Sequence, residues 1–167
     1  KKPIRADEAT EGLTPLPTID LSVHALIPDK YVPDAAQRLF YYKEMMTCRT
    51  DADLDRSLAE LQDRYGRAPE EVMAAFSVMR LRMRADALCI EKIDGKGGRF
   101  AVTFHEDAEV SPRFFSLLTK RNREAYLSRT QFIWPIQGAP LGACEKMLDA
   151  MSQVLEEIER QRQELGV

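Results

Sequence analysis

The sequence predicts an α+β fold in which a small β-sheet, built from a hairpin and additional strands, packs with several amphipathic helices. Apolar residues recur every three or four positions through several long segments, which is the period of a helix buried on one face. Shorter segments alternate apolar and polar residues and end at glycine or proline, which is typical of half-buried strands. Helices and strands mixed along the chain in this way favour one sheet covered by helices.

The N-terminal segment 1–18 contains prolines, acidic residues and no apolar period, so we expect a poorly ordered connecting arm. Residues 19–24 then alternate with the period of a short first strand, which Pro28 stops. Residues 19–167 are numerous enough to bury a core, and we expect them to form a single domain. The chain begins with Lys rather than Met, which suggests a fragment of a longer protein.

Two successive helices are predicted after this strand. Asp34 suits the cap position of the first helix, which reaches about Cys48. Thr50 suits the cap of the second, and Asp53 stands three residues later, where a capping box usually has Glu. Gly66 stands where a left-handed residue would end this helix, because glycine adopts positive φ without steric cost.

A third helix and a hairpin follow. Pro69, with two acidic residues directly after it, suits the start of a long helix that reaches about Leu88. Residues 90–94 and 99–105 have strand composition and are joined by the turn 95–98, which contains three glycines. We therefore expect a two-stranded ribbon in the middle of the chain.

The remaining elements are a short helix, a strand and a long C-terminal helix. Ser111 is a cap residue, and the proline after it suits the first helical position of a helix through about Lys120. Residues 131–136 are rich in β-forming residues and include the only Trp, which predicts a strand. From Leu141 onward apolar residues mark one face of a long helix that becomes wholly polar near its end.

Composition limits the function classes. The net charge of −3 gives no general attraction for phosphate backbones, and 44% apolar with 31% charged residues is ordinary for a globular helical domain. No apolar stretch is long enough to cross a bilayer and no signal peptide is recognisable, so we expect a cytoplasmic location. Cys48, Cys89 and Cys144 are isolated in sequence, and we expect buried, reduced thiols.

Patterns of catalytic or metal-binding residues are weak. The two histidines, His24 and His105, lie on predicted strands and stand beside neither Cys nor Ser. Neither His-Glu-x-x-His nor paired Cys-x-x-Cys occurs, and the glycine turn lacks the spacing of a phosphate-binding loop. We therefore predict no catalytic residue, no metal site and no cofactor. An unrecognised small hydrolase or transferase is the least favoured alternative.

Basic residues on the third helix, the hairpin and the following segment suggest a nucleic-acid contact. Acidic neighbours dilute this positive charge, and the arginines of the helix do not share one face. A solvated, salt-bridged surface is therefore favoured over a nucleic-acid surface. The residues concerned are Arg80, Arg82, Arg84, Lys92, Lys96, Arg99, Lys120, Arg121 and Arg123.

The C-terminal end of the second helix carries an oddly placed acidic pair. Glu60 and Asp63 are three residues apart and share a face, although the negative end of the helix dipole disfavours negative charge there. Arg56 and Arg64, each four positions from Glu60, are suited to neutralise it locally. Alternatively, the pair docks onto arginines of another domain, where charge complementarity supplies orientation and specificity. The residues alone leave both interpretations open.

The run 27–43, followed by the segment 60–66 and Pro69, resembles the C-terminal (TRCF) domain of bacterial transcription-repair coupling factor. Segments 80–82 and 88–93 add to this resemblance, which extends through the final helix and is densest before residue 93.

The sequence departs mildly from the family pattern. Members usually have Gly where Cys89 stands and Phe where Tyr65 stands. After Val110 the match is mostly one of pattern. These departures leave the fold that the resemblance implies unchanged.

The resemblance implies a non-catalytic regulatory domain of a DNA translocase that acts in transcription-repair coupling and nucleotide excision repair. In this family the domain packs on the N-terminal UvrB-like module of the same protein and masks the surface that binds UvrA. The acidic positions of the Glu-Leu-x-Asp-Arg-aromatic-Gly motif belong to that docking surface. They match Glu60 and Asp63 here, with Arg64 as a supporting residue.

We therefore expect an intramolecular, autoinhibitory clamp whose interdomain interface includes these three residues. Its direct partner is the UvrB-like module, and UvrA and RNA polymerase are engaged only through the parent protein. No direct nucleic acid and no membrane partner is expected. An accessory nucleic-acid- or protein-binding module without an autoinhibitory role is the alternative.

Overall fold

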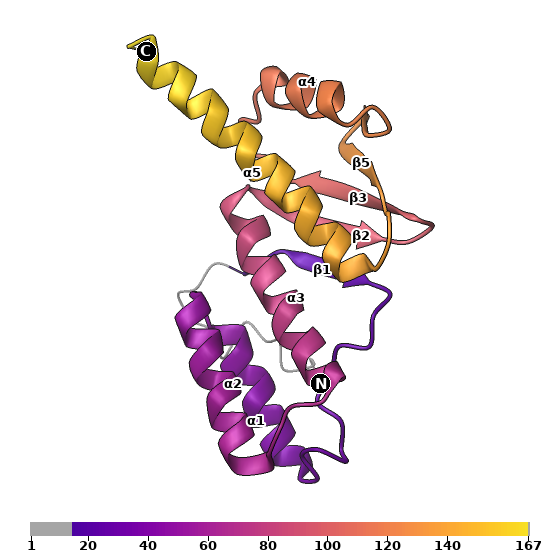
Figure 1. Ribbon diagram of the computed structural model, residues 1–167, viewed down its shortest axis with the longest axis vertical. Coiled ribbons are helices and arrows are strands. Elements are labelled where there is room, and N and C mark those ends of the chain that lie inside the picture. Colours follow the sequence, from indigo (N-terminus) through magenta and orange to yellow (C-terminus); the bar gives the residue numbers. More distant parts are fainter. Residues whose placement is uncertain (1–14, 167) are drawn as a thin grey trace, which may run out of the picture. The chain divides into compact units, whose positions relative to one another are not determined.

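A computed structural model describes residues 15–166 of the chain, so most of the arm predicted at 1–18 lies outside the described residues. The described part contains five helices and five strands, and the α+β class is confirmed (Figure 1). In chain order the elements are β1 (Thr18–Leu21), α1 (Ala35–Thr47), α2 (Asp51–Tyr65), α3 (Glu70–Ala87), β2 (Ile90–Gly95), β3 (Arg99–Phe104), α4 (Pro112–Arg121), β4 (Tyr126–Ser128), β5 (Gln131–Pro135) and α5 (Pro140–Glu164).

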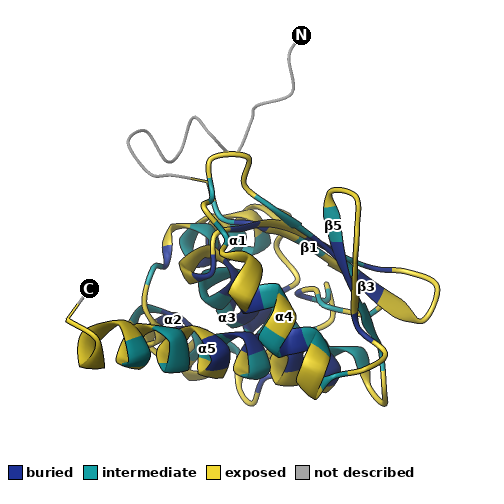
Figure 2. Ribbon diagram, turned by 90° about the horizontal axis from the view of Figure 1, so that it is seen from above, coloured by how far each residue is buried: buried dark blue, intermediate teal, exposed yellow. Residues whose placement is uncertain are grey.

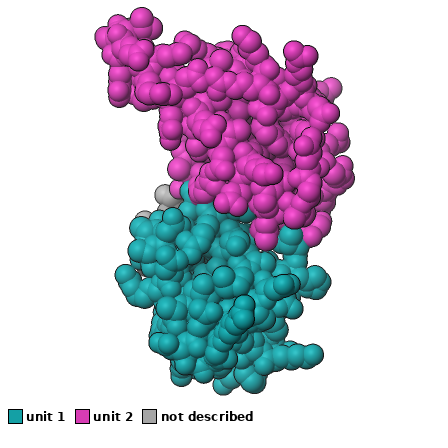
Figure 3. All heavy atoms as spheres, in the orientation of Figure 1, with its two compact units in different colours: residues 1–16, 23–83 teal, residues 17–22, 84–167 magenta. Residues whose placement is uncertain are grey.

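The described residues divide into two compact units (Figure 3). Of the described residues, unit 1 contains 15–16 together with Val23–Met83, and unit 2 contains Pro17–Ser22 together with 84–166. The boundary between them falls within α3. A single domain over 19–167 stays a prediction, and each unit is described by itself.

Unit 1 is organised around the hairpin of α1 and α2, which contact each other. Its core is apolar and almost fully shielded from water, and burying each large side chain contributes roughly 1.5–3 kcal/mol. The core residues are Ile27, Val32, Tyr41, Met45, Cys48, Leu54, Leu61, Ala68, Val72, Ala75, Phe76 and Met79.

The helix ends of unit 1 confirm the capping signals of the sequence. The Asp34 carboxylate accepts a hydrogen bond of 2.8 Å from the Ala36 backbone N–H. Thr50 and Asp53 form a reciprocal capping box at the start of α2. Gly66 follows α2 with φ of 87°, a left-handed backbone conformation that favours glycine.

Unit 2 is built on a mixed five-stranded sheet with the order β1-β2-β3-β5-β4. β1 pairs parallel with β2 in the register Thr18 to Lys92, and the other neighbouring pairs are antiparallel. A Cβ added at Gly95 would lie 3.0 Å from the Leu21 side chain. The small residue at this position therefore permits the close pairing of β1 with β2.

Helices α4 and α5 contact each other within unit 2. Phe114 and Phe115 of α4 form a cluster of aromatic contacts with Phe104 of β3 and Phe132 of β5. α5 buries one stripe of residues as far as Val154, and its later turns carry only exposed and half-buried residues (Figure 2). The long, finally polar helix predicted from the sequence is confirmed.

Three features differ from the expectations. β1 spans Thr18–Leu21 rather than 19–24, and β4 has no counterpart among the predicted elements. Cys48 and Cys144 are buried as expected, but Cys89 is exposed, so the expectation of a third buried thiol was wrong. Cys89 lies in the turn between α3 and β2 with φ of 59°, and it is exposed although its neighbours Leu88 and Ile90 are buried.

Candidate functional site

The predicted site residues Glu60, Asp63 and Arg64 lie on the last turns of α2 and are all exposed. Contacts from outside the helix hold this end in place. The Tyr31 hydroxyl donates a hydrogen bond of 2.6 Å to the Gly66 carbonyl. The acidic pair is therefore displayed on a fixed helix end.

Arg64 is anchored on the aromatic side chains beneath it. Its guanidinium donates a hydrogen bond of 3.3 Å to the hydroxyl of Tyr41, which is fully buried. The same guanidinium lies 6.0 Å from the ring centroid of Tyr65. Arg64 thus lies along the surface of the hairpin, and its role at an interface stays a prediction.

The aspartates at the start of α2 have cationic partners. Asp51 and Asp55 both form ion pairs with Arg80 of α3. Asp53 lies 3.8 Å from Arg56.

The acidic pair at the other end of α2 is different. Within residues 15–166, Glu60 and Asp63 form no ion pair. Arg56 is instead placed beside Asp53, and Arg64 donates to Tyr41. Neither of the two arginines that were candidates for local neutralisation therefore forms an ion pair with Glu60. The pKa of Arg64 is raised first by its hydrogen bond to Tyr41 and least by the charge of Glu60.

A surface groove between α1 and α2 extends from Glu60 toward the N-terminal end of α2. It encloses about 260 Å³ and is defined by the residues that line it. These are Glu44, Thr47, Cys48, Asp53, Arg56, Ser57 and Glu60.

Two polar atoms of this groove are buried without a hydrogen-bond partner among the described residues. They are Oε2 of Glu44 and Oγ of Ser57, and Ser57 is only 6% exposed. Burial raises the pKa of the Glu44 carboxyl, and the charge of Glu60 raises it further. The groove therefore holds a carboxylate whose charged form is poorly solvated.

Asp53, at the other end of the groove, is in the opposite situation. Its carboxylate accepts hydrogen bonds of 3.2 Å from the backbone N–H groups of Arg49 and Thr50. These bonds, first the one from Arg49, lower the pKa of Asp53. Asp53 is thus occupied by capping α2, whereas Glu44 and Glu60 have unused acceptor capacity.

Sequence reasoning did not single out Glu44 or Ser57. A signal existed for Ser57, because it stands on the same helical face as the buried Leu54 and Leu61. A polar residue on an apolar stripe is an informative observation. Glu44 gave no such signal, because its burial arises only when α2 packs beside α1.

Four of the nine basic residues considered for nucleic-acid binding form ion pairs with carboxylates. Arg80 forms ion pairs on unit 1 as described above. On unit 2, Arg84 pairs with Asp149, Arg121 with Glu157, and Lys96 with Asp20 at 3.4 Å. These contacts neutralise the positive charge locally.

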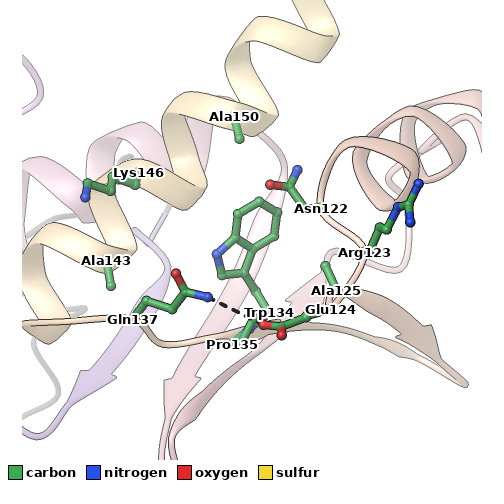
Figure 4. Close-up of a pocket in the computed structure, with 10 residues that line it drawn as sticks. All are labelled: Asn122, Arg123, Glu124, Ala125, Trp134, Pro135, Gln137, Ala143, Lys146 and Ala150. Carbon is green, nitrogen blue, oxygen red and sulfur yellow. Dashed lines mark hydrogen bonds between the residues drawn. The ribbon is translucent and has the colours of Figure 1, made fainter.

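A second cavity, of about 420 Å³, lies on unit 2 beside the indole of Trp134 (Figure 4). Trp134 stands between the Asn122–Ala125 segment and α5, and Gln137 donates a hydrogen bond of 3.5 Å to Glu124. The lining residues include no histidine and no hydroxyl or thiol nucleophile. The cavity therefore lacks the paired nucleophile and base of a hydrolase site.

The described part of the chain has neither a cluster of side chains suited to a metal ion nor a helix suited to a membrane. Residues 15–166 contain no group of three or more His, Cys, Asp or Glu side chains arranged to hold a metal ion. None of the described helices is both long and apolar enough to span a membrane.

Comparison with known proteins identifies the family. The model of the TRCF domain matches residues 21–114, more than half of the chain. The chain belongs to the TRCF domain family. The match covers all of the α1–α2 hairpin and α3, so this TRCF domain carries its acidic pair and its groove within the matched region.

Curated relatives of this TRCF domain are named transcription-repair-coupling factors. The Escherichia coli protein is 32% identical over 123 residues, covering 72% of this chain and 10% of the relative. The Myxococcus xanthus protein is 31% identical over 145 residues, covering 85% of this chain and 12% of the relative. The chain thus spans about a tenth of the length of the relatives that it matches.

A solved structure supports the fold. It is described as the C-terminal domain of transcription-repair coupling factor and matches with a TM-score of 0.71. The match covers 86% of this chain and 96% of the solved chain at 14% identity. At this identity the likeness establishes the fold of the TRCF domain.

Proposed function

We propose that this TRCF domain is a non-catalytic autoinhibitory domain of a transcription-repair coupling DNA translocase. It docks on the N-terminal UvrB-like module of its parent protein through the C-terminal end of α2 and masks the surface that binds UvrA. Glu60 and Asp63 are the charged contacts, and Arg64 is a supporting residue of the interface. The names of the relatives and the match to the TRCF domain support the identity of the parent protein as a transcription-repair coupling factor.

The observation that carries this proposal is the contrast between the two ends of α2. The aspartates at its start are held in ion pairs by Arg80 and Arg56. Glu60 and Asp63 are exposed and form no ion pair with the described residues. The negative end of the helix dipole also opposes their charge. Their placement does not serve helix stability, whereas arginines of a partner would compensate both charges.

The physical character of the surface suits a restraint that must open. An exposed polar contact between domains is weaker than a large apolar one and gives specificity more than raw affinity. A preference of a few kcal/mol for the docked state keeps the masked form dominant and still allows release.

Calorimetric titration of the chain against the separately expressed UvrB-like module tests the proposal. Wild type is expected to bind, and the double variant Glu60→Lys, Asp63→Lys is expected to lose at least tenfold in affinity, because like charges would face the partner's arginines. In the full-length parent protein, the same variant should bind UvrA more strongly.

The matched control reverses two exposed carboxylates with the same spacing on another helix. Glu156 and Glu159 of α5 are both exposed and three residues apart. Their double substitution by Lys produces the same change in net charge and should leave binding unchanged. Equal binding by wild type and the Glu60, Asp63 variant would overturn the assignment of these residues. Absence of wild-type binding at millimolar concentration would overturn the docking function.

A further inference from the structure

We propose that the groove between α1 and α2 is a socket for a single arginine side chain of the protein partner. Glu44 and Glu60 bind its guanidinium from two sides, and the Ser57 hydroxyl accepts a hydrogen bond at the floor. This inference deepens the proposed function, on which it rests for the protein that supplies the arginine.

The first support is the unused acceptor capacity inside the groove. Oε2 of Glu44 and Oγ of Ser57 are shielded from solvent without a hydrogen-bond partner in the described chain. Ser57 is 94% buried, as its exposed fraction is 6%. A buried polar atom without a partner costs roughly 1–3 kcal/mol, which a donor entering the groove would recover.

The second support is the charge balance of the groove. Its lining includes three carboxylates, those of Glu44, Asp53 and Glu60, and one cation, Arg56. The Arg56 side chain is 78% exposed and lies beside Asp53 rather than between the glutamates. Burial and the neighbouring Glu60 raise the pKa of Glu44. A cation placed between the two carboxylates would reverse this increase in pKa.

The chemistry favours arginine over other cations. A guanidinium is planar, has five N–H donors and is more weakly hydrated than an ammonium group, so it can serve two carboxylates and a hydroxyl together. The described residues offer no set of three ligands arranged for a metal ion.

The surroundings of the groove indicate that the arginine belongs to a protein. Phe40 lies one helical turn before Glu44 on α1, so it shares that face, and it is 47% exposed. An exposed aromatic ring beside a charged socket can pack against the residues that flank the inserted arginine.

A titration with a small arginine derivative tests the socket without any partner protein. The 167-residue chain is titrated with N-acetyl-arginine amide, and the NMR signals of the Glu44 carboxyl and the Ser57 amide are followed. Saturable shifts of both signals are expected. N-acetyl-citrulline amide, which has nearly the same shape without the charge, should give none.

Two variants and a control make the test specific. Glu44→Gln should weaken binding of the arginine derivative roughly tenfold or more, on the scale of a buried charge pair. Ser57→Ala should weaken it by about fivefold, the value of one hydrogen bond, while the free chain stays at least as stable because an unpartnered hydroxyl is removed. Glu159→Gln changes an exposed carboxylate of α5 and should have no effect.

Failure of the socket can be distinguished from failure of the docking function. If the arginine derivative does not shift Glu44 and Glu44→Gln binds the UvrB-like module as wild type does, the socket is overturned and docking through Glu60 and Asp63 stands. If the derivative binds in the groove but the module does not bind the chain, the socket stands and the proposed docking function is overturned.

Discussion

Cys89 has a backbone conformation that is unfavourable for a residue with a side chain. Its φ of 59° lies in the left-handed region, which costs an L-residue about 1–2 kcal/mol relative to right-handed conformations. Its side chain is exposed, so little packing compensates this cost. Glycine, which the family usually has at this position, adopts the conformation freely.

Replacing Cys89 by Gly should therefore stabilise the chain by about 0.5–1 kcal/mol, because relief of backbone strain exceeds the entropy gained by the unfolded state. Urea denaturation of the reduced protein measures this difference. Cys89→Ala removes the thiol but keeps the strain, so its stability should equal that of wild type. A Gly variant no more stable than the Ala variant would contradict the prediction.

The raised pKa of Glu44 predicts how the stability of the chain depends on pH. Burial, and then the charge of Glu60, raise its pKa in the folded state. Between the unfolded pKa and the raised folded pKa, the folded chain retains a proton that the unfolded chain has released. The free energy of unfolding due to this group therefore falls as pH rises through that window.

Glu44→Gln should consequently be more stable than wild type at neutral pH, and the difference should vanish below about pH 4, where both side chains are neutral. Urea denaturation of both proteins between these pH values measures it. The groups that face Glu44 from α2, Asp53, Arg56 and Glu60, are common to both proteins, so the difference isolates residue 44. If the variant were more stable than wild type by the same amount at low pH, packing rather than the charge of Glu44 would be the cause.

At the scale of elements, the N-terminus of α2 links local stability to the site. The Thr50 hydroxyl accepts a hydrogen bond of 3.1 Å from the Asp53 N–H, and the Asp53 carboxylate accepts one of 3.2 Å from the Thr50 N–H. This box fixes the first turn of the helix, where Asp53 also borders the groove. Loss of the cap would loosen both the first turn of α2 and the adjacent end of the groove.

Thr50→Ala should lower the free energy of unfolding by about 1 kcal/mol, the usual value of a threonine cap. The same variant should raise the pKa of Asp53, because the hydroxyl and backbone contacts that favour its charged form are weakened. Urea denaturation and NMR titration of Asp53 measure the two effects. Thr130→Ala, in an exposed turn, is the control and should change neither quantity.

Local signals predicted the helices well, because caps and apolar stripes act within one element. Asp34, Thr50 and Gly66 mark their helix ends as the sequence indicated. The short strand β4 was missed, since three exposed residues show no alternation and form a strand only by pairing with β5. The parallel pairing of β1 with β2 could not be predicted from local sequence patterns either, because it joins segments that are distant in the chain.

The candidate site was predictable only in part, for the same reason. Glu60 and Asp63 stand out in the sequence because their charges conflict with the dipole of their own helix. The contribution of Glu44 depends on α2 lying beside α1, which no local pattern records. Much of the residue pattern that carries the family resemblance, including Ile27, Val32 and Tyr41, instead builds the core of unit 1.

At the scale of the whole molecule, charge argues against nucleic-acid binding. The chain has a net charge of −3, and several of its arginines are held by carboxylates in the described part. A phosphate backbone would have to displace those carboxylates to gain comparable contacts.

The isolated chain should therefore show no measurable affinity for single- or double-stranded DNA, even at about 50 mM salt, where phosphate contacts are strongest. Fluorescence anisotropy with labelled oligonucleotides measures this. A basic DNA-binding domain of known affinity serves as the positive control. Binding that declines steeply with added salt would instead support an accessory nucleic-acid module.

The path of the chain through the two units sets an order of folding. β1 is synthesised before the whole of Val23–Met83, yet its partner strand β2 comes after that segment. Closing so long a loop costs entropy, whereas the α1–α2 hairpin needs only neighbouring residues. The strand that leaves the ribosome first is therefore the last of these elements to find its place, and the outer edge of β2 stays unpaired until β1 docks on it.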